Sequence, residues 1–141
     1  MEFLENSLTY EQYDKLRTSV GWNNFPEEQA KITLVNSAHI LSVMENGRAV
    51  AMARLIGDGM YYVIVDVVVD PVYQKKGIGT TLINKMLQYI ENNLPIEGRI
   101  SVQLIAEKGK ESFYQQFGFK MIPHEYCGSG MQKVIYNKQD K

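Results

Sequence analysis

Several features that would define a functional class are scarce or missing in this 141-residue chain. It has one cysteine, Cys127, so no intrachain disulfide can form, and a reducing compartment is expected. The two histidines, His39 and His124, lack the spacing of metal ligands, so no metal is expected. The formal net charge is only −1, which gives no reason to expect a nucleic acid or an anionic membrane as a partner.

Long apolar runs are also missing. The longest candidate, residues 60–69, is interrupted by Asp66 and is much shorter than the ~18 residues that a membrane span requires. The first five residues are acidic and lack the basic and apolar regions of a signal peptide. We therefore expect a cytoplasmic protein with no membrane partner.

The domain organisation follows from length and composition. At 45% hydrophobic residues the chain can bury a core, and no repeat or linker interrupts it. We expect a single domain over residues 1–141, with residues 137–141 as a frayed tail.

The apolar pattern predicts a mixed α/β fold with one central sheet. Asn46-Gly47 and Asp58-Gly59 are hairpin-turn sequences, and they divide the middle of the chain into a three-strand meander. The third strand of the meander lacks strict polar alternation, so a central position in the sheet is expected. Helices are predicted at residues 9–19, 26–35, 78–93 and 110–117, and strands at 40–44, 48–56, 60–69, 99–105, 119–122 and 131–136, in the order ααβββαβαββ.

The junction between the third strand and the next helix has the character of an anion-binding loop. The strand ends at Val69, and residues 74–79, Gln-Lys-Lys-Gly-Ile-Gly, lead directly into the helix. Glycines allow backbone N–H groups to converge, and the helix directs the positive end of its dipole at the same place. Both features suit a pyrophosphate. The alternative to an anion-binding role is a purely structural one, in which Gly77 and Gly79 only shape the turn and the lysines beside them are solvated.

The spacing of the loop distinguishes among nucleotide-binding motifs. No G-x-x-x-x-G-K-[ST] string exists, and a Rossmann G-x-G-x-x-G fails because Leu82 occupies the third glycine position. What remains is Q-x-x-G-x-G, with Gln74, Gly77 and Gly79 in the fixed places. This pattern resembles the pyrophosphate loop of the GNAT superfamily of N-acetyltransferases. Residues 113–119, Phe-Tyr-Gln-Gln-Phe-Gly-Phe, resemble the family's F-Y-x-x-x-G-F string, and the resemblance extends from about residue 8 to 136.

The resemblance implies a single mixed, mostly antiparallel central sheet flanked by helices. It also implies acetyl-CoA as co-substrate and direct attack of an amine on the thioester. It also implies that main-chain groups of Val67 and Val69 pair with the pantetheine arm and act as a small oxyanion site. Backbone amides from Lys75 to Thr80 would then hold the pyrophosphate. The cofactor-binding residues expected on this basis are Val67, Val68, Val69, Gln74, Lys75, Lys76, Gly77, Ile78, Gly79 and Thr80.

Tyr114 is the expected donor to the leaving thiolate. A tyrosine has a pKa near ~10 and a thiol near ~8.5, so complete proton transfer is disfavoured by about 2 kcal/mol. We therefore expect Tyr114 to donate a hydrogen bond to the developing thiolate. Its alternative interpretation is an ordinary core tyrosine.

The proton acceptor is less well defined. Asp66 is an unusual charge in a valine-rich strand and is a candidate, directly or through water. Its alternative is a buried or edge carboxylate paired with Arg54 or another cation. A water held by backbone carbonyls could also serve.

The acceptor is expected to be a primary amine of a small molecule, such as a polyamine, an amino sugar or an arylalkylamine. The first two helices and residues 123–130 would border its pocket, as the resemblance implies. Two alternatives stay open: a protein or peptide N-acetyltransferase, and a non-catalytic acyl-CoA-binding module. Members of this family often form homodimers, and nothing in the sequence decides that point. Candidate aromatic walls are Trp22, Phe25, Tyr61, Tyr62 and Tyr126.

Overall fold

The computed structural model describes residues 1–137 of the chain. It divides into two compact units, Met1–Ile105 and Ala106–Lys141, and each is described here by itself. Residues 138–141, which make up nearly all of the predicted frayed tail, lie outside the described residues. Within residues 1–137 no helix has both the length and the apolar content needed to cross a bilayer.

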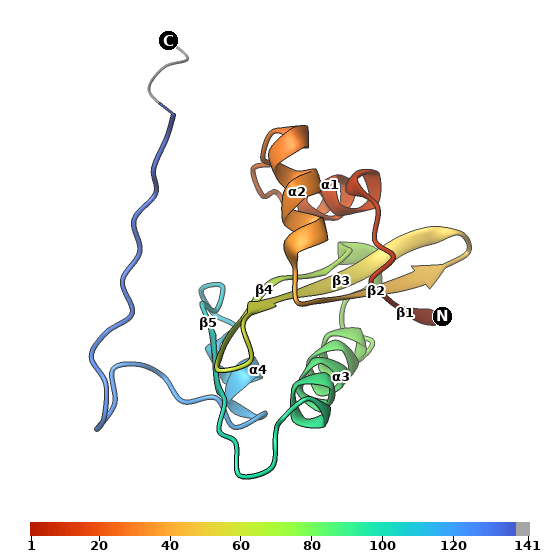
Figure 1. The fold of residues 1–141 in the computed structure, drawn as a ribbon. Coiled ribbons are helices and arrows are strands. Elements are labelled where there is room, and N and C mark those ends of the chain that lie inside the picture. The colour runs from red at the N-terminus through yellow and green to blue at the C-terminus, as the bar shows by residue number, and fades with distance from the viewer. Residues whose placement is uncertain (138–141) are drawn as a thin grey trace. The chain divides into compact units, whose positions relative to one another are not determined.

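The first unit is a five-stranded sheet with helices on both faces. The strands lie in the order β1-β2-β3-β4-β5, antiparallel except for the parallel pair β4–β5. Helices α1 and α2 cover one face and α3 covers the other (Figure 1). The elements are β1 (Glu2–Glu5), α1 (Tyr10–Ser19), α2 (Glu27–Asn36), β2 (His39–Glu45), β3 (Arg48–Gly57), β4 (Tyr61–Val69), the 3₁₀ turn η1 (Pro71–Tyr73), α3 (Ile78–Asn92) and β5 (Ser101–Leu104).

Local sequence signals explain where several elements begin and end. Thr9 caps α1 and forms a complete capping box with Gln12, because each side chain accepts the other's backbone N–H. Asn46 and Gly47 have φ values of 51° and 76°, as a two-residue hairpin turn requires. Helix α3 packs on the sheet through one apolar face, whose buried members are Ile78, Leu82, Ile83, Met86 and Ile90.

The middle strand of the sheet is β3, and β4 lies next to it as an interior strand, so the central position expected for residues 60–69 is confirmed. Strand β4 is the fourth of five, although it is still flanked by strands on both sides. Its burial is uneven: Tyr62, Ile64 and Val68 are buried, Tyr61 is exposed and the remaining residues are partly buried. In β3, residues 50–53 and Leu55 are all completely inaccessible. The continuous buried run therefore belongs to β3.

The second unit contains one short helix, α4 (Glu111–Gln115), and then a long segment without regular structure. The strands predicted at residues 119–122 and 131–136 are absent, because the only β-pairing in the described part of this segment is the bridge between His124 and Cys127. The strand β1 was not predicted. The observed order is therefore βααβββαβα rather than ααβββαβαββ, while the mixed α/β class with a single open sheet is confirmed.

Candidate active site

The loop between β4 and α3 is held in shape by two side chains. The carboxylate of Asp70 accepts a hydrogen bond from the backbone N–H of Val72 at 3.0 Å and so caps η1. The amide of Gln74 donates to the carbonyl of Val69 at 2.9 Å. The loop is thus tied back to the last residue of β4, which explains why a glutamine occupies the first fixed place of the Q-x-x-G-x-G pattern.

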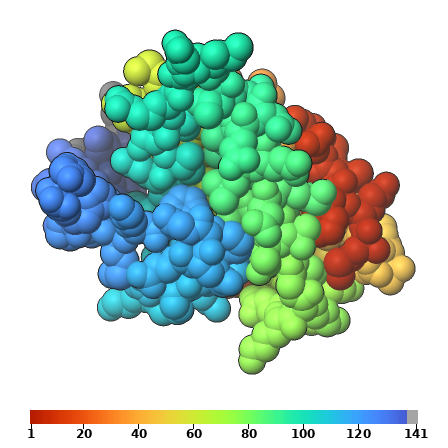
Figure 2. All heavy atoms as spheres, turned by 90° about the horizontal axis from the view of Figure 1, so that it is seen from below, coloured from red at the N-terminus to blue at the C-terminus, as the bar shows by residue number. Residues whose placement is uncertain are grey.

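Backbone N–H groups are left free where α3 begins. Gly77, at φ 82°, is the N-cap residue, and no side chain caps this end of the helix. The first backbone bond of the helix runs from the N–H of Thr81 to the carbonyl of Gly77, at 3.1 Å. Within the described chain, the N–H groups of residues 75–80 therefore have no hydrogen-bond partner. The loop is exposed beside the N-terminal end of α3, in the yellow-green region of Figure 2.

Positive charge surrounds these amides. Lys75 and Lys76 are both exposed, and the ammonium of Lys76 lies 5.3 Å from the centre of the Tyr73 ring. Lys75 adopts a φ of 63°, which is uncommon for a residue with a side chain. Free amides, a helix N-terminus and two lysines together form a surface suited to a phosphate group.

Strand β4 has an open edge immediately before this loop. Its parallel pairing with β5 runs from Tyr61 only as far as Ile64, opposite Leu104. In the described chain no strand pairs with residues 65–69 on that side. The main chain of Val67 and Val69, two of the predicted binding residues, therefore lies on a segment with one unpaired edge.

A β-bulge coincides with the start of this open edge. Asp66 and Val67 together lie opposite the single residue Ala53 of β3, where the register shifts. Asp66 has a φ of 52°, in the left-handed region that residues other than glycine rarely occupy.

The Asp66 carboxylate is buried and accepts hydrogen bonds from three side chains. Arg17 donates at 2.6 Å, the hydroxyl of Tyr13 at 2.7 Å and Arg54 at 3.0 Å. The side chain of Asp66 is only 7% exposed, and those of the two arginines are 11% exposed. The pairing with Arg54 that the sequence allowed is present. The partners on α1, Tyr13 and Arg17, were missed because they lie 53 and 49 residues away in the sequence.

Arg17 also contacts the connection between α1 and α2. It donates to the carbonyl of Asn23 at 2.6 Å, and its guanidinium lies 5.2 Å from the ring centres of both Trp22 and Phe25. These two aromatics are therefore close to the Asp66 cluster. The other three expected wall residues differ: Tyr62 is buried in the core, and Tyr61 and Tyr126 are 63% and 85% exposed.

Tyr114 lies on α4 in the second unit, so its position is described only within that unit. Its ring packs edge-on against Phe113 at 5.0 Å and Phe119 at 6.3 Å, which explains the aromatic spacing of its motif. Burial, and secondarily the charge of Glu107, raises the pKa of the Tyr114 hydroxyl. The group therefore stays protonated at neutral pH and can donate a hydrogen bond.

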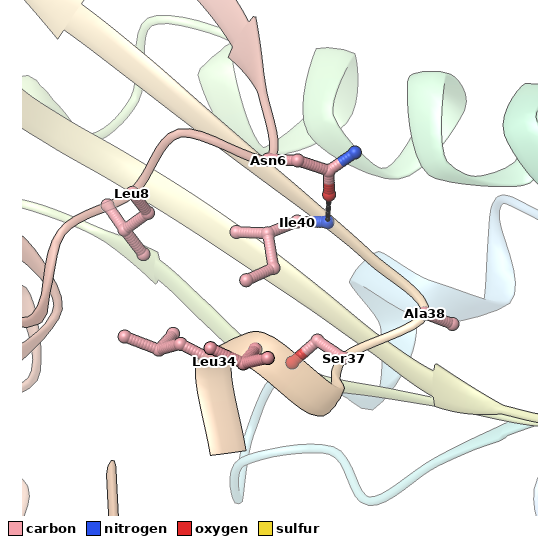
Figure 3. Close-up of a pocket in the computed structure, with 7 residues that line it drawn as sticks. Asn6, Leu8, Leu34, Ser37, Ala38 and Ile40 are labelled. Carbon is pink, nitrogen blue, oxygen red and sulfur yellow. Dashed lines mark hydrogen bonds between the residues drawn. The ribbon is translucent and has the colours of Figure 1, made fainter. Parts of the chain in front are cut away.

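One pocket in the first unit contains none of the predicted site residues. It has a volume of about 370 Å³ and lies among the segment after β1, the end of α2 and the start of β2 (Figure 3). Five of its seven lining residues have apolar side chains, and Asn6 and Ser37 are the polar members. The hydroxyl of Ser37 lies 3.2 Å from the guanidinium of Arg54, and this contact joins the pocket rim to the Asp66 cluster.

No group of three His, Cys, Asp or Glu side chains within residues 1–137 is placed to hold a metal ion. Cys127 is exposed, and its sulfur lies 3.3 Å from the imidazole of His124.

Comparisons with known proteins show which family the chain belongs to. The acetyltransferase (GNAT) domain family matches residues 6–139. An uncharacterised N-acetyltransferase, ycf52, of Pyropia yezoensis is 34% identical over 118 residues, covering 79% of this chain and 65% of that protein. Serotonin N-acetyltransferase 2, chloroplastic, of Oryza sativa is 36% identical over 83 residues, covering 58% of this chain and 40% of that protein. The chain thus spans less than two thirds of the length of either relative.

A solved structure shows the same fold over nearly the whole chain. It is a protein of unknown function from methicillin-resistant Staphylococcus aureus, described as a probable acetyltransferase. It superimposes with a TM-score of 0.84 at 28% identity and covers 96% of this chain and 98% of its own.

Proposed function

The chain belongs to the GNAT acetyltransferase family, and from that premise we propose that it transfers the acetyl group of acetyl-CoA to a primary amine of a small molecule. The observation that carries the proposal is the row of free backbone amides at the start of α3, directly after the open edge of β4. When bound, acetyl-CoA supplies an activated acetyl thioester. The residues of this chain bind it, orient it and stabilise the charge that develops.

The loop would hold the pyrophosphate. Each free N–H of residues 75–80 can donate to a phosphate oxygen, and the helix dipole and the two lysines add favourable charge. Gly79 lies in the first turn of α3, where the absence of a side chain permits close approach to the backbone. Gln74 acts indirectly in this proposal, because its side chain is engaged with Val69.

The open edge of β4 would receive the pantetheine arm. Val67 and Val69 lack a strand partner on that side, so an extended amide-containing chain can pair with their main chain as another strand would, except at the Val69 carbonyl that Gln74 already engages. A backbone N–H at this edge can donate to the thioester oxygen. Such a fixed donor stabilises the negative charge that the oxygen gains during attack.

Tyr114 would donate a hydrogen bond to the departing thiolate. The raised pKa of its hydroxyl supports this role, because the group stays protonated across the neutral range. It does not have to surrender its proton, since the attacking amine becomes an acidic ammonium that can supply one.

The amine acceptor would enter beside α1 and α2. The cluster of Trp22 and Phe25 around Arg17 provides aromatic surface in that region. The rice relative is named a serotonin N-acetyltransferase, and serotonin is an arylalkylamine. That name supports the small-molecule class of acceptor. Protein or peptide amines are the competing acceptors.

The test is a panel of amines assayed by release of free thiol from acetyl-CoA. The panel contains polyamines, amino sugars, arylalkylamines and a peptide library. Turnover with a small amine, and none with peptides, supports the proposal. Turnover with peptides alone contradicts the acceptor class, and tight acetyl-CoA binding without any turnover indicates a non-catalytic binding module.

Cytoplasmic location is also part of the proposal, and the oligomeric state is a separate question that the sequence leaves open. The single cysteine is compatible with a reducing compartment. Fractionation of cells and light scattering of the purified protein test these two points separately.

A further inference from the structure

We propose that Asp66 is a positioning residue that fixes the main chain of the β4 bulge, and not the proton acceptor of the reaction. Arg17, Arg54 and Tyr13 hold its carboxylate for this purpose. The inference rests on the proposed function, because it assigns a task to the β4 edge that would receive the thioester arm.

The first observation is the backbone conformation. Asp66 has a φ of 52° at the point where two residues of β4 lie opposite one residue of β3. Aspartate tolerates this left-handed conformation better than most residues because its short side chain can accept local hydrogen bonds, but it is still strained. Strain of this kind persists only where surrounding contacts enforce it.

The second observation is that the contacts come from two different elements. Arg54 belongs to β3, and Tyr13 and Arg17 belong to α1. The carboxylate therefore accepts hydrogen bonds both from the neighbouring strand and from the covering helix. All three donors reach it within 3.0 Å. The cluster therefore fixes Asp66 in space, and with it the peptide groups on either side.

The third observation is where this fixed point lies. Pairing of β4 with β5 ends at Ile64, and the bulge begins two residues later. A bulge bends its strand and increases the local twist. The cluster thus holds β4 in the bent form at the place where its edge opens, directly before Val67.

The same contacts argue against proton transfer to Asp66. A proton acceptor needs a lone pair free to reach the substrate, directly or through water. Here two guanidinium groups and a hydroxyl take three of the roughly four acceptor positions of the carboxylate, and its side chain is only 7% exposed. Arg17 also links the cluster to the α1–α2 connection through Asn23, so the region beside the expected acceptor is joined to the bulge.

Three substitutions at the same position separate positioning from proton acceptance. Asp66→Asn keeps an oxygen acceptor and tolerates positive φ, Asp66→Gly loses the side chain but accepts the conformation, and Asp66→Ala loses both. If Asp66 positions the strand, kcat falls in the order Asn, Gly, Ala, by roughly 3-fold, 10-fold and 100-fold. The Kd for acetyl-CoA, measured by calorimetry, rises in the same order. The pH profile of kcat keeps its shape.

If Asp66 accepts the proton, all three variants lose activity equally, by about 10²- to 10⁴-fold, and lose the acidic limb of the pH profile. Their Kd for acetyl-CoA stays that of the wild type. This result overturns the inference. Should Asp66→Ala fail to fold, the Asn variant decides alone, because a severe loss of kcat with unchanged Kd contradicts positioning and a mild loss supports it.

The outcomes also distinguish this inference from the proposed function. A wild-type protein that does not bind acetyl-CoA overturns both. A wild-type protein that binds and turns over, with equal losses in the three variants, overturns the role of Asp66 alone.

Discussion

The side-chain amide of Gln74 donates a hydrogen bond to the main-chain carbonyl of Val69 over 2.9 Å, and this bond closes the loop onto the strand that precedes it. Gln74→Ala removes the bond without removing any of the backbone N–H groups that we propose bind the pyrophosphate. A hydrogen bond of this kind contributes about 1 kcal/mol, so we expect the Kd for acetyl-CoA to rise roughly 5-fold. Val72→Ala is the matched control, because Val72 is 76% exposed on the same loop. Equal affinity in the two variants would show that the loop keeps its shape unaided.

Gly77 is required for its conformation and not for lack of space. Its φ is 82°, yet a Cβ at this position meets no atom within 4 Å. Gly77→Ala should therefore cost about 1 kcal/mol or more of unfolding free energy, whereas Gly77→Asn should cost less because asparagine tolerates this region. Denaturant unfolding measures both. If alanine is tolerated as well as asparagine, the left-handed N-cap is not a constraint.

Tyr114→Phe should lower kcat by roughly 10- to 100-fold, with little change in the KM for acetyl-CoA, because it removes a donor that acts on the departing thiolate. Tyr136→Phe is the control, since Tyr136 is another tyrosine of the same unit, lies outside the expected acceptor border and is 78% exposed. Because the pKa of Tyr114 is raised, the wild-type rate should not fall between pH 7 and pH 9 through loss of this proton. A Tyr114→Phe enzyme with wild-type kcat contradicts the assignment.

Ionisation of Tyr13 should lower the free energy of unfolding at alkaline pH. Burial, together with the charge of Asp66, raises its pKa to about 12. Near pH 10 the tyrosine of the unfolded chain ionises while that of the folded chain does not, so the unfolded state binds fewer protons and stability falls as pH rises toward 12. Between pH 9 and pH 11 the loss should be about 1 kcal/mol.

The comparison with Tyr13→Phe isolates this contribution. The variant cannot ionise at position 13, so its unfolding free energy should fall less steeply over the same pH range. Parallel pH dependence in the two proteins contradicts a raised pKa at Tyr13.

The sequence predicted the elements that carry local signals. The capping box at Thr9, the turn at Asn46-Gly47 and the glycine loop each depend on residues close in the chain, and each is confirmed. Strand β1 was missed because it has only four residues, two of them acidic, and forms through pairing with β2 some forty positions away. The reverse error occurred at residues 131–136, where a β-prone composition lacks a partner strand in the described chain.

The candidate site divides in the same way. A phosphate-binding role for the loop could be predicted from residues 74–79 alone, because the expected chemistry lies in consecutive backbone groups. The cluster at Asp66 could be predicted only in part. A charged residue in a valine-rich strand is unusual, and Arg54, which is nearby in the sequence, could be named as a candidate partner. Tyr13 and Arg17 gave no signal, since only the packing of α1 on the sheet brings them to the carboxylate. The roles of Val67 to Val69, of the loop and of Tyr114 stay predictions.

The most direct measurement is calorimetric titration of acetyl-CoA into the wild-type protein, Gly79→Asp and Gly128→Asp. Both variants replace a glycine by a residue with one negative charge. Gly79 lies in the first turn of α3. Gly128 lies outside that helix, and a Cβ there meets no atom within 4 Å, so the substitution at Gly128 is the control. The account predicts binding by the wild type and by Gly128→Asp and none by Gly79→Asp, because the carboxylate repels the pyrophosphate and blocks the amides. Retained affinity in a folded Gly79→Asp protein would show that the pyrophosphate is held elsewhere.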